Sequence, residues 1–196
     1  MRQFIRALLA TLVLPLAGLQ PPATGPAQVD PDKDAYEIYS LLLRKEALAQ
    51  HITAWAIAEY TQPFVRPGDC VRPAPGDRVL IDDLLAKNKT PVKLMRKFDL
   101  PEYALLSRDE VKNIVTFHVP YADEKAGNER KFPFNAPMIF NLSAVGFNEN
   151  HTSALVYVDH DCVGGNGSLC GGGAYHSMSK VDGKWRVEAD WCGWVF

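Results

Sequence analysis

The last third of the chain, residues 137–196, most limits what this sequence can fold into. Its loop Cys162-Val-Gly-Gly-Asn-Gly-Ser-Leu-Cys170-Gly-Gly-Gly173 holds two cysteines and six glycines in twelve residues. Runs that alternate apolar and polar residues lie on both sides of this loop, and alternation with a period of two predicts half-buried strands. The expected strands form a four-stranded antiparallel meander, at residues 139–147, 153–160, 174–181 and 184–194.

The dipeptide Asp182-Gly183 fits a two-residue hairpin turn and predicts how the last two strands pair. If Val181 lies opposite Lys184, then His176 lies opposite Ala189. We expect one face of this hairpin to pack on the core and the other to meet solvent. The core face would carry His176, Met178, Trp185, Val187, Ala189 and Trp191, and the solvated face Tyr175, Ser177, Ser179, Arg186, Glu188 and Asp190.

The N-terminus has the pattern of a secretory signal peptide. Arg2 and Arg6 precede a run of thirteen mainly apolar residues, 7–19, and a Pro-rich stretch with small residues follows. A membrane-spanning helix needs about 20 apolar residues, so an uncleaved anchor is the less favoured alternative. We expect three parts: a signal peptide at 1–27, a disordered lead-in at 28–33, and one domain at 34–196 that is periplasmic or secreted and has no membrane span.

Charge argues against a nucleic-acid partner. Without the signal peptide the chain has 19 basic and 23 acidic residues, and no dense basic patch is evident. The largest basic cluster, Lys93, Arg96 and Lys97, is typical of a solvated surface.

Four cysteines, Cys70, Cys162, Cys170 and Cys192, remain in the exported chain. An even count in that compartment predicts two disulfides, for which three pairings are possible. We favour Cys162–Cys170, which closes the glycine loop and is worth roughly 2.5 kcal/mol in the chain-entropy model. The remaining pair, Cys70–Cys192, would tie the first half of the chain to the last strand, with two separate thiols as the alternative.

The first two thirds of the chain predict fewer and shorter elements. Asp34 is a candidate cap for an amphipathic helix, and two Pro-rich stretches predict long loops. The fold class is therefore α+β: an N-terminal helix and a mostly antiparallel, curved sheet that ends in the four-stranded meander and is stabilised by disulfides. The expected elements are a helix at 35–50, a strand at 52–60, a loop at 62–78, a short helix at 82–88, a strand at 103–107, a helical turn at 108–113 and a loop at 120–137.

Several motifs resemble those of a widespread group of exported bacterial proteins of unknown function. They are Ser143-Ala-Val-Gly-Phe-Asn148, Ala154-Leu-Val-Tyr-Val158, Leu169-Cys-Gly-Gly-Gly173 and Asp182-Gly-Lys-Trp185, and the front of the chain is similar at Tyr36-Glu-Ile-Tyr39, near Thr61 and at 83–88. The resemblance implies export and a Cys-Gly loop, here with a longer spacing between the two cysteines. It implies no catalytic residues.

Two chemical sites are conceivable around His160 and His176, which we expect on one face of neighbouring strands. With a carboxylate from Asp159 or Asp161 they could bind zinc, but a third ligand and a His-Glu-x-x-His spacing are missing. Cys162 with a histidine base could act as a nucleophile, although cysteines of exported proteins are usually oxidised. We therefore expect neither a metal nor another cofactor.

The function that the sequence favours is non-enzymatic binding of an unknown small ligand or envelope protein. The site would be the Cys162–Cys170 glycine loop with the adjacent sheet face, where aromatic and polar side chains alternate. Its candidate residues are Tyr157, Asp159, His160, Tyr175 and His176. The alternative is a hydrolase that uses His160 and His176 with a metal or with Cys162, and a third possibility is a structural envelope component without a small ligand.

Overall fold

The computed structural model describes residues 31–50, 52, 54–62, 78–117, 138–162 and 171–195. The predicted signal peptide, nearly all of both long loops, and residues 163–170 of the glycine loop lie outside this part of the chain. The elements in chain order are α1 (Pro31–Gln50), β1 (Trp55–Ala58), α2 (Arg78–Lys87), β2 (Tyr103–Leu106), α3 (Arg108–Phe117), β3 (Met138–Leu142), β4 (Gly146–Phe147), β5 (Ser153–Cys162), β6 (Gly171–Val181) and β7 (Lys184–Val195).

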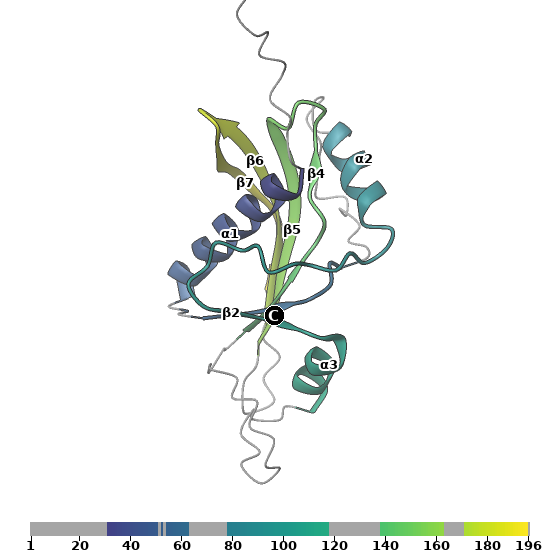
Figure 1. The fold of residues 1–196 in the computed structure, drawn as a ribbon, viewed down its shortest axis with the longest axis vertical. Coiled ribbons are helices and arrows are strands. Elements are labelled where there is room, and N and C mark those ends of the chain that lie inside the picture. The colour runs from purple at the N-terminus through teal and green to yellow at the C-terminus, as the bar shows by residue number, and fades with distance from the viewer. Residues whose placement is uncertain are drawn as a thin grey trace, which may run out of the picture.

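These strands form one open, mixed sheet of seven strands (Figure 1). The order is β2-β1-β3-β5-β6-β7, and β4 pairs with β5 beside this path. The predicted α+β class is confirmed, and the last four predicted strands are present, the first of them split into β3 and β4. However, β1 pairs in parallel with both β2 and β3, so one end of the sheet is parallel. Parallel neighbours need long crossover connections, and the segments that contain α2 and α3 are those crossovers.

Helix α1 begins at Pro31, three residues before the predicted cap Asp34. Proline suits a first helical position because its missing N–H would have no partner there. Asp34 is instead buried inside the fold, where it accepts hydrogen bonds from Lys180 Nζ at 2.6 Å and from Trp185 Nε1 at 3.2 Å. This aspartate therefore joins α1 to the last hairpin.

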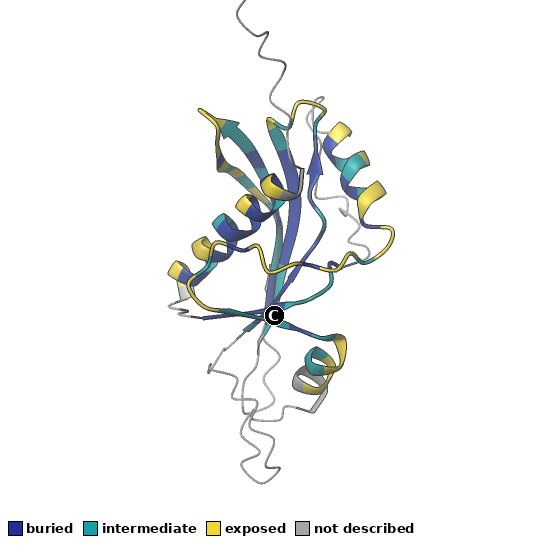
Figure 2. Ribbon diagram, viewed as in Figure 1, coloured by how far each residue is buried: buried dark blue, intermediate teal, exposed yellow. Residues whose placement is uncertain are grey.

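Helices pack on parts of both faces of the sheet, and the buried residues between them form the dark interior in Figure 2. Helix α1 packs on one face with a large apolar cluster that includes Phe140, Val156 and Trp185. On the opposite face α2 covers a second cluster, and α3 contacts a third one next to β1–β3. The expectation that one face of the β5–β7 region is solvated is therefore wrong at the end covered by α2, where Leu80 and Leu84 lie against β5 and β6.

The approach of α2 to the sheet depends on Gly146 in β4. A Cβ atom there would lie 2.4 Å from the Leu80 carbonyl oxygen and 2.7 Å from the Leu84 backbone nitrogen. Only a residue without a side chain lets the helix come this close. Asp83 adds a bond across the contact, because its Oδ2 accepts from the Phe147 backbone N–H at 2.7 Å.

The last hairpin has the predicted turn, but its register changes along the strands. Val181 lies opposite Lys184 and Met178 opposite Val187, as predicted, and both turn residues have positive φ. An irregularity between Ser177 and Met178 then shifts the pairing, so that His176 lies opposite Asp190 and not opposite Ala189. Strand β7 has one extra residue at this point, and the side chains of β7 beyond it therefore lie on the faces opposite to those predicted.

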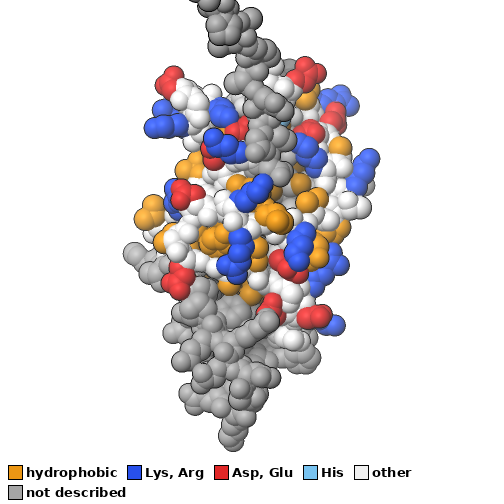
Figure 3. All heavy atoms as spheres, in the orientation of Figure 1, with side chains coloured by type: hydrophobic (Ala, Val, Ile, Leu, Met, Phe, Trp, Pro, Cys, Tyr) orange, Lys and Arg blue, Asp and Glu red, His pale blue; other side chains and the backbone are white. Residues whose placement is uncertain are grey.

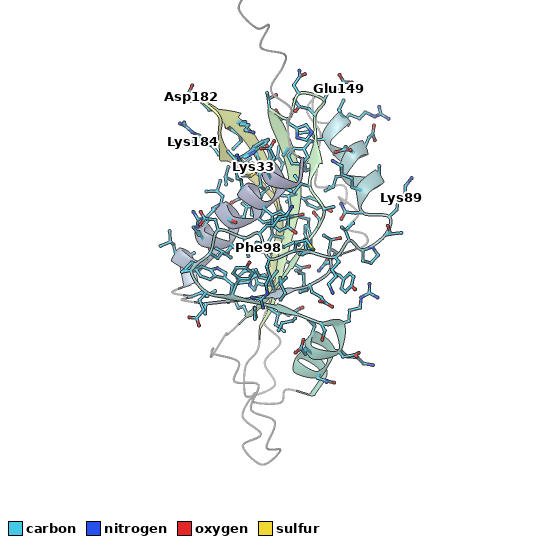
Figure 4. All side chains as sticks on the ribbon, in the orientation of Figure 1. Lys33, Lys89, Phe98, Glu149, Asp182 and Lys184 are labelled. Carbon is cyan, nitrogen blue, oxygen red and sulfur yellow. The ribbon has the colours of Figure 1, made fainter. Side chains whose placement is uncertain are left out.

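A segment at residues 88–102 connects α2 to β2 by crossing over α1, in front of the sheet in Figure 1. Leu94 and Phe98 are buried in the α1 cluster and anchor this strap. Phe98, labelled in Figure 4, meets the rings of Tyr36 and Tyr103 with centroids 5.1 and 5.3 Å away. The strap therefore packs on the α1 side of the sheet, and its first part, with Pro91, also borders the cavity described next.

Candidate functional site: a mixed-charge cavity beside α3

A cavity of about 630 Å³ lies on the sheet face opposite α1, next to α3. Its floor includes Ala58 of β1, Leu106 of β2 and Asn141 of β3. Asp161 of β5 adds a carboxylate, and α3 with residues 59–62 supplies further lining. Cavities of this size accommodate small organic ligands.

Strand alternation explains why these residues line the cavity. Ile57 of β1 and Phe140 of β3 belong to the α1 cluster, so their neighbours Ala58 and Asn141 point to the opposite face. Small Ala58 leaves space in the floor. On β5, Tyr157 packs under α2 on this same face, and Asp159 and Asp161 follow it at intervals of two.

The acidic side of the cavity is a hydrogen-bonded group. Asn141 Nδ2 donates to Asp161 Oδ2 at 3.0 Å, and Gln62 Nε2 donates to both oxygens of Asp159 at 3.0 and 2.9 Å. Burial raises the pKa of the Asp159 carboxyl above its ordinary value, although hydrogen bonds from Asn141 and Gln62 oppose that rise. The negative charge of Asp161 adds to it.

The basic side of the cavity is formed by Arg108 and Lys112 of α3, a helix that begins with a capping box. Ser107 Oγ accepts from the Glu110 backbone N–H at 3.3 Å, and Glu110 Oε2 accepts from the Ser107 backbone N–H at 2.8 Å. This cap fixes the helix start, from which Arg108 and Lys112, one turn apart, line the cavity. The Arg108 guanidinium carbon lies 4.9 Å from the centroid of the Tyr60 ring, a cation–π contact that holds the side chain at the rim.

The structure does not assemble the predicted histidine site. His160 lies opposite Gly172, whereas His176 lies opposite Val156, so four residues separate the two along the strands. At a rise of about 3.3 Å per residue, this places them roughly 13 Å apart. Within the described residues no group of three or more His, Cys, Asp or Glu side chains is arranged to hold a metal ion.

The five predicted binding residues are distributed over different environments. Tyr157 and Tyr175 are buried beneath α2 with ring centroids 4.8 Å apart, and burial raises the pKa of Tyr175. His176 is buried on the α1 side, and His160 is half-buried on that side. Only Asp159 lies beside the cavity. The predicted exposed aromatic surface is therefore wrong, because α2 covers it.

His176 has a structural environment. Its Nδ1 lies 2.8 Å from Asp190 Oδ1, and Asp190 Oδ2 accepts from Lys45 Nζ at 2.6 Å. Burial lowers the pKa of His176, while the contact with Asp190 works in the other direction. The same change of register moves Trp191, predicted on the core face, to the α2 side opposite Tyr175.

The predicted disulfides involve side chains that lie outside the described part of the structure. Cys70 and Cys170 lie outside the described residues, and for Cys162 and Cys192 the structure describes the backbone alone. Cys162 pairs with Met138 at the end of β5, directly after the cavity residue Asp161.

The strap carries a second notable surface, with hydrophobic side chains between Lys and Arg side chains in the middle of the face in Figure 3. Val92 and Met95 are about half exposed. The basic side chains there are engaged locally: Lys93 pairs with Glu59 at 3.3 Å, and Arg96 lies 5.9 Å from the Tyr103 ring centroid. Lys93, Arg96 and Lys97 are all exposed, as predicted for a solvated surface.

Sequence reasoning missed Arg108, Lys112, Gln62 and Asn141 as site residues. The capping box Ser107-Arg-Asp-Glu110 was a usable signal, because it marks the start of a helix and so predicts that Arg108 and Lys112 share a helix face. No local pattern shows that this face meets Asp161, which lies about 50 residues later.

In the described part of the chain, no helix is both long enough and apolar enough to cross a membrane. No protein-family model, curated protein sequence or solved structure matches this chain.

Proposed function

We propose that this protein is an exported, non-enzymatic domain that binds a small ligand in the cavity beside α3. The observation that carries the proposal is a 630 Å³ cavity whose lining includes the cations Arg108 and Lys112, the carboxylate of Asp161 and apolar residues such as Leu106. A few polar groups around an otherwise apolar hollow are typical of ligand sites.

Cavity filling tests this proposal. Ala58→Phe places a ring in the floor, and Ala86→Phe makes the same change at an exposed position of α2. A library of small metabolites would be screened against the wild type by thermal shift, and hits measured by isothermal titration calorimetry. We expect Ala86→Phe to bind every hit like the wild type and Ala58→Phe to lose binding. Equal binding by both variants, with both folded by circular dichroism, would refute a site in this cavity.

The alternative function, a hydrolase at His160 and His176, loses its geometric support because these residues lie roughly 13 Å apart along neighbouring strands. The two functions differ in what happens to a bound ligand. We expect every hit to be recovered unchanged by mass spectrometry after long incubation with the protein. Turnover that persists in Ala58→Phe and disappears in His160→Ala would favour the hydrolase.

We also propose that the mature chain is exported and carries the Cys162–Cys170 and Cys70–Cys192 disulfides. Support comes from the signal-peptide pattern, the even cysteine count and the resemblance to exported proteins. Asp161 directly precedes Cys162, so a disulfide there would restrain one border of the cavity. The test is alkylation without reduction of protein recovered from the periplasm or medium, followed by peptide mass analysis. We expect all four cysteines to resist labelling, whereas a labelled Cys162 would contradict the disulfide.

A further inference from the structure

We infer that the cavity selects a small zwitterion, a free amino acid or a short peptide with both termini free, with its carboxylate at Arg108 and Lys112 and its ammonium group at Asp161. This inference rests on the proposed function and names the ligand class. Charges of both signs line the same hollow from different elements, which is the arrangement that a ligand with two opposite charges complements.

The basic side is available for a ligand anion. Within the described residues neither Arg108 nor Lys112 forms an ion pair, and Glu110 of the same helix binds Ser107 in the capping box. A guanidinium that already rests on the Tyr60 ring loses little freedom on binding, and a guanidinium can bind a carboxylate through two parallel hydrogen bonds.

The acidic side has one carboxylate with spare capacity. Asp161 accepts from Asn141 through Oδ2, and its Oδ1 has no partner among the described residues. The two neighbouring carboxylates already have partners. Both oxygens of Asp159 accept hydrogen bonds from Gln62 Nε2, and Glu59 forms an ion pair with Lys93 at 3.3 Å. Asp161 is therefore the group that a ligand ammonium would meet.

The apolar lining and the cavity volume limit the side chains and the size of the ligand. Ala58, Leu106 and Val111 offer an apolar surface for an aliphatic side chain. A volume near 630 Å³ holds a dipeptide or tripeptide and is small for a folded partner. A dianion would place a second negative charge near Asp161, and a neutral sugar would leave Arg108 and Lys112 without an anion. Repulsion from Asp161 therefore disfavours a dianion, and the unpaired cations disfavour a neutral sugar.

The experiment measures binding of four probes to the mature chain by isothermal titration calorimetry: dialanine, N-acetyl-dialanine, dialanine amide and glucuronate. We expect dialanine to bind most tightly, and either blocked terminus to weaken binding by about tenfold or more, the loss of one charge-assisted contact. Arg108→Gln should abolish the preference for the free carboxylate and keep that for the free amine. Asp161→Asn should do the reverse, and Arg78→Gln on the exposed start of α2 serves as the charge-matched control.

Each outcome decides between the inference and the function on which it rests. Tighter binding of glucuronate, equal binding of blocked and free dialanine, or no binding of dialanine would overturn the zwitterion inference. The cavity would remain a ligand site if other ligands from the screen are lost in Ala58→Phe. If Ala58→Phe leaves the binding of all ligands unchanged, the proposed function fails with it.

Discussion

Replacing Gly146 by alanine tests the tightest contact in the fold. The new methyl group would lie 2.4 Å from the Leu80 carbonyl oxygen, 2.7 Å from the Leu84 nitrogen and 2.8 Å from the Leu84 Cβ. Two of these atoms belong to the α2 backbone and cannot rotate away, so helix and strand must separate. The φ of Gly146 is not in the left-handed region, so alanine meets a steric obstacle without backbone strain.

The expected loss follows from these contacts. Overpacking of a core costs about 1–3 kcal/mol, and the backbone character of the clash places Gly146→Ala at the upper end. Alanine also lowers the conformational entropy of the unfolded chain, which offsets up to about 1 kcal/mol of this loss. The net loss is therefore about 2 kcal/mol, which lowers the urea midpoint by about 1 M for an m-value near 2 kcal/mol/M.

The assay is urea unfolding followed by tryptophan fluorescence, with hydrogen exchange to locate the damage. We expect the amides of α2 to lose protection in Gly146→Ala. The control is Gly183→Ala in the hairpin turn, where φ is +75° and no atom lies within 4 Å of the new Cβ. Gly183→Ala should lose roughly 1–2 kcal/mol of stability because alanine is strained at positive φ, and the hairpin amides should lose protection instead. A wild-type midpoint for Gly146→Ala, or full protection of α2, would refute the close-packing argument.

Two further predictions concern groups buried on the α1 side. Asp34→Ala leaves Lys180 without the carboxylate that it contacts at 2.6 Å, and we expect the free energy of unfolding in urea to fall by about 3 kcal/mol. Asp34→Asn should lose less. A loss below about 1 kcal/mol for Asp34→Ala would show that the pair is dispensable. Burial lowers the pKa of His176 in the folded state, so the unfolded chain takes up this proton first and stability falls as pH drops below about 6.5. His176→Gln, which keeps a polar group beside Asp190, should reduce the slope of unfolding free energy against pH between about 7 and 5; an unchanged slope would contradict this origin.

Local patterns predicted most of the elements. The dipeptide Asp182-Gly183 gave the correct turn because only residues that tolerate positive φ form it, and both residues have positive φ here. Alternation likewise predicted β5, β6 and β7 and the short strand β1. These signals act over a few neighbouring residues, which is why they can be read without knowing the rest of the fold.

The candidate site was mostly hidden from sequence reasoning. The sequence places the carboxylates of Asp159 and Asp161 beside His160, but the expected partner His176 lies four residues farther along the sheet. The partners found are Gln62, Asn141 and Arg108, which come from three distant segments. Their meeting depends on β1 pairing in parallel with β3, and no local pattern encodes that pairing.

The sequence by itself determined the α+β class, the final hairpin and the order of the short elements, because propensity, alternation and turn chemistry are local properties. Tertiary structure alone decided that α2 buries Tyr157 and Tyr175, since this burial requires Gly146 to admit the helix. It also decided that the bulge brings His176 to Asp190, and that α3 faces Asp161 across a cavity. These features arise from contacts between residues far apart in the chain, where packing and pairing outweigh local preference.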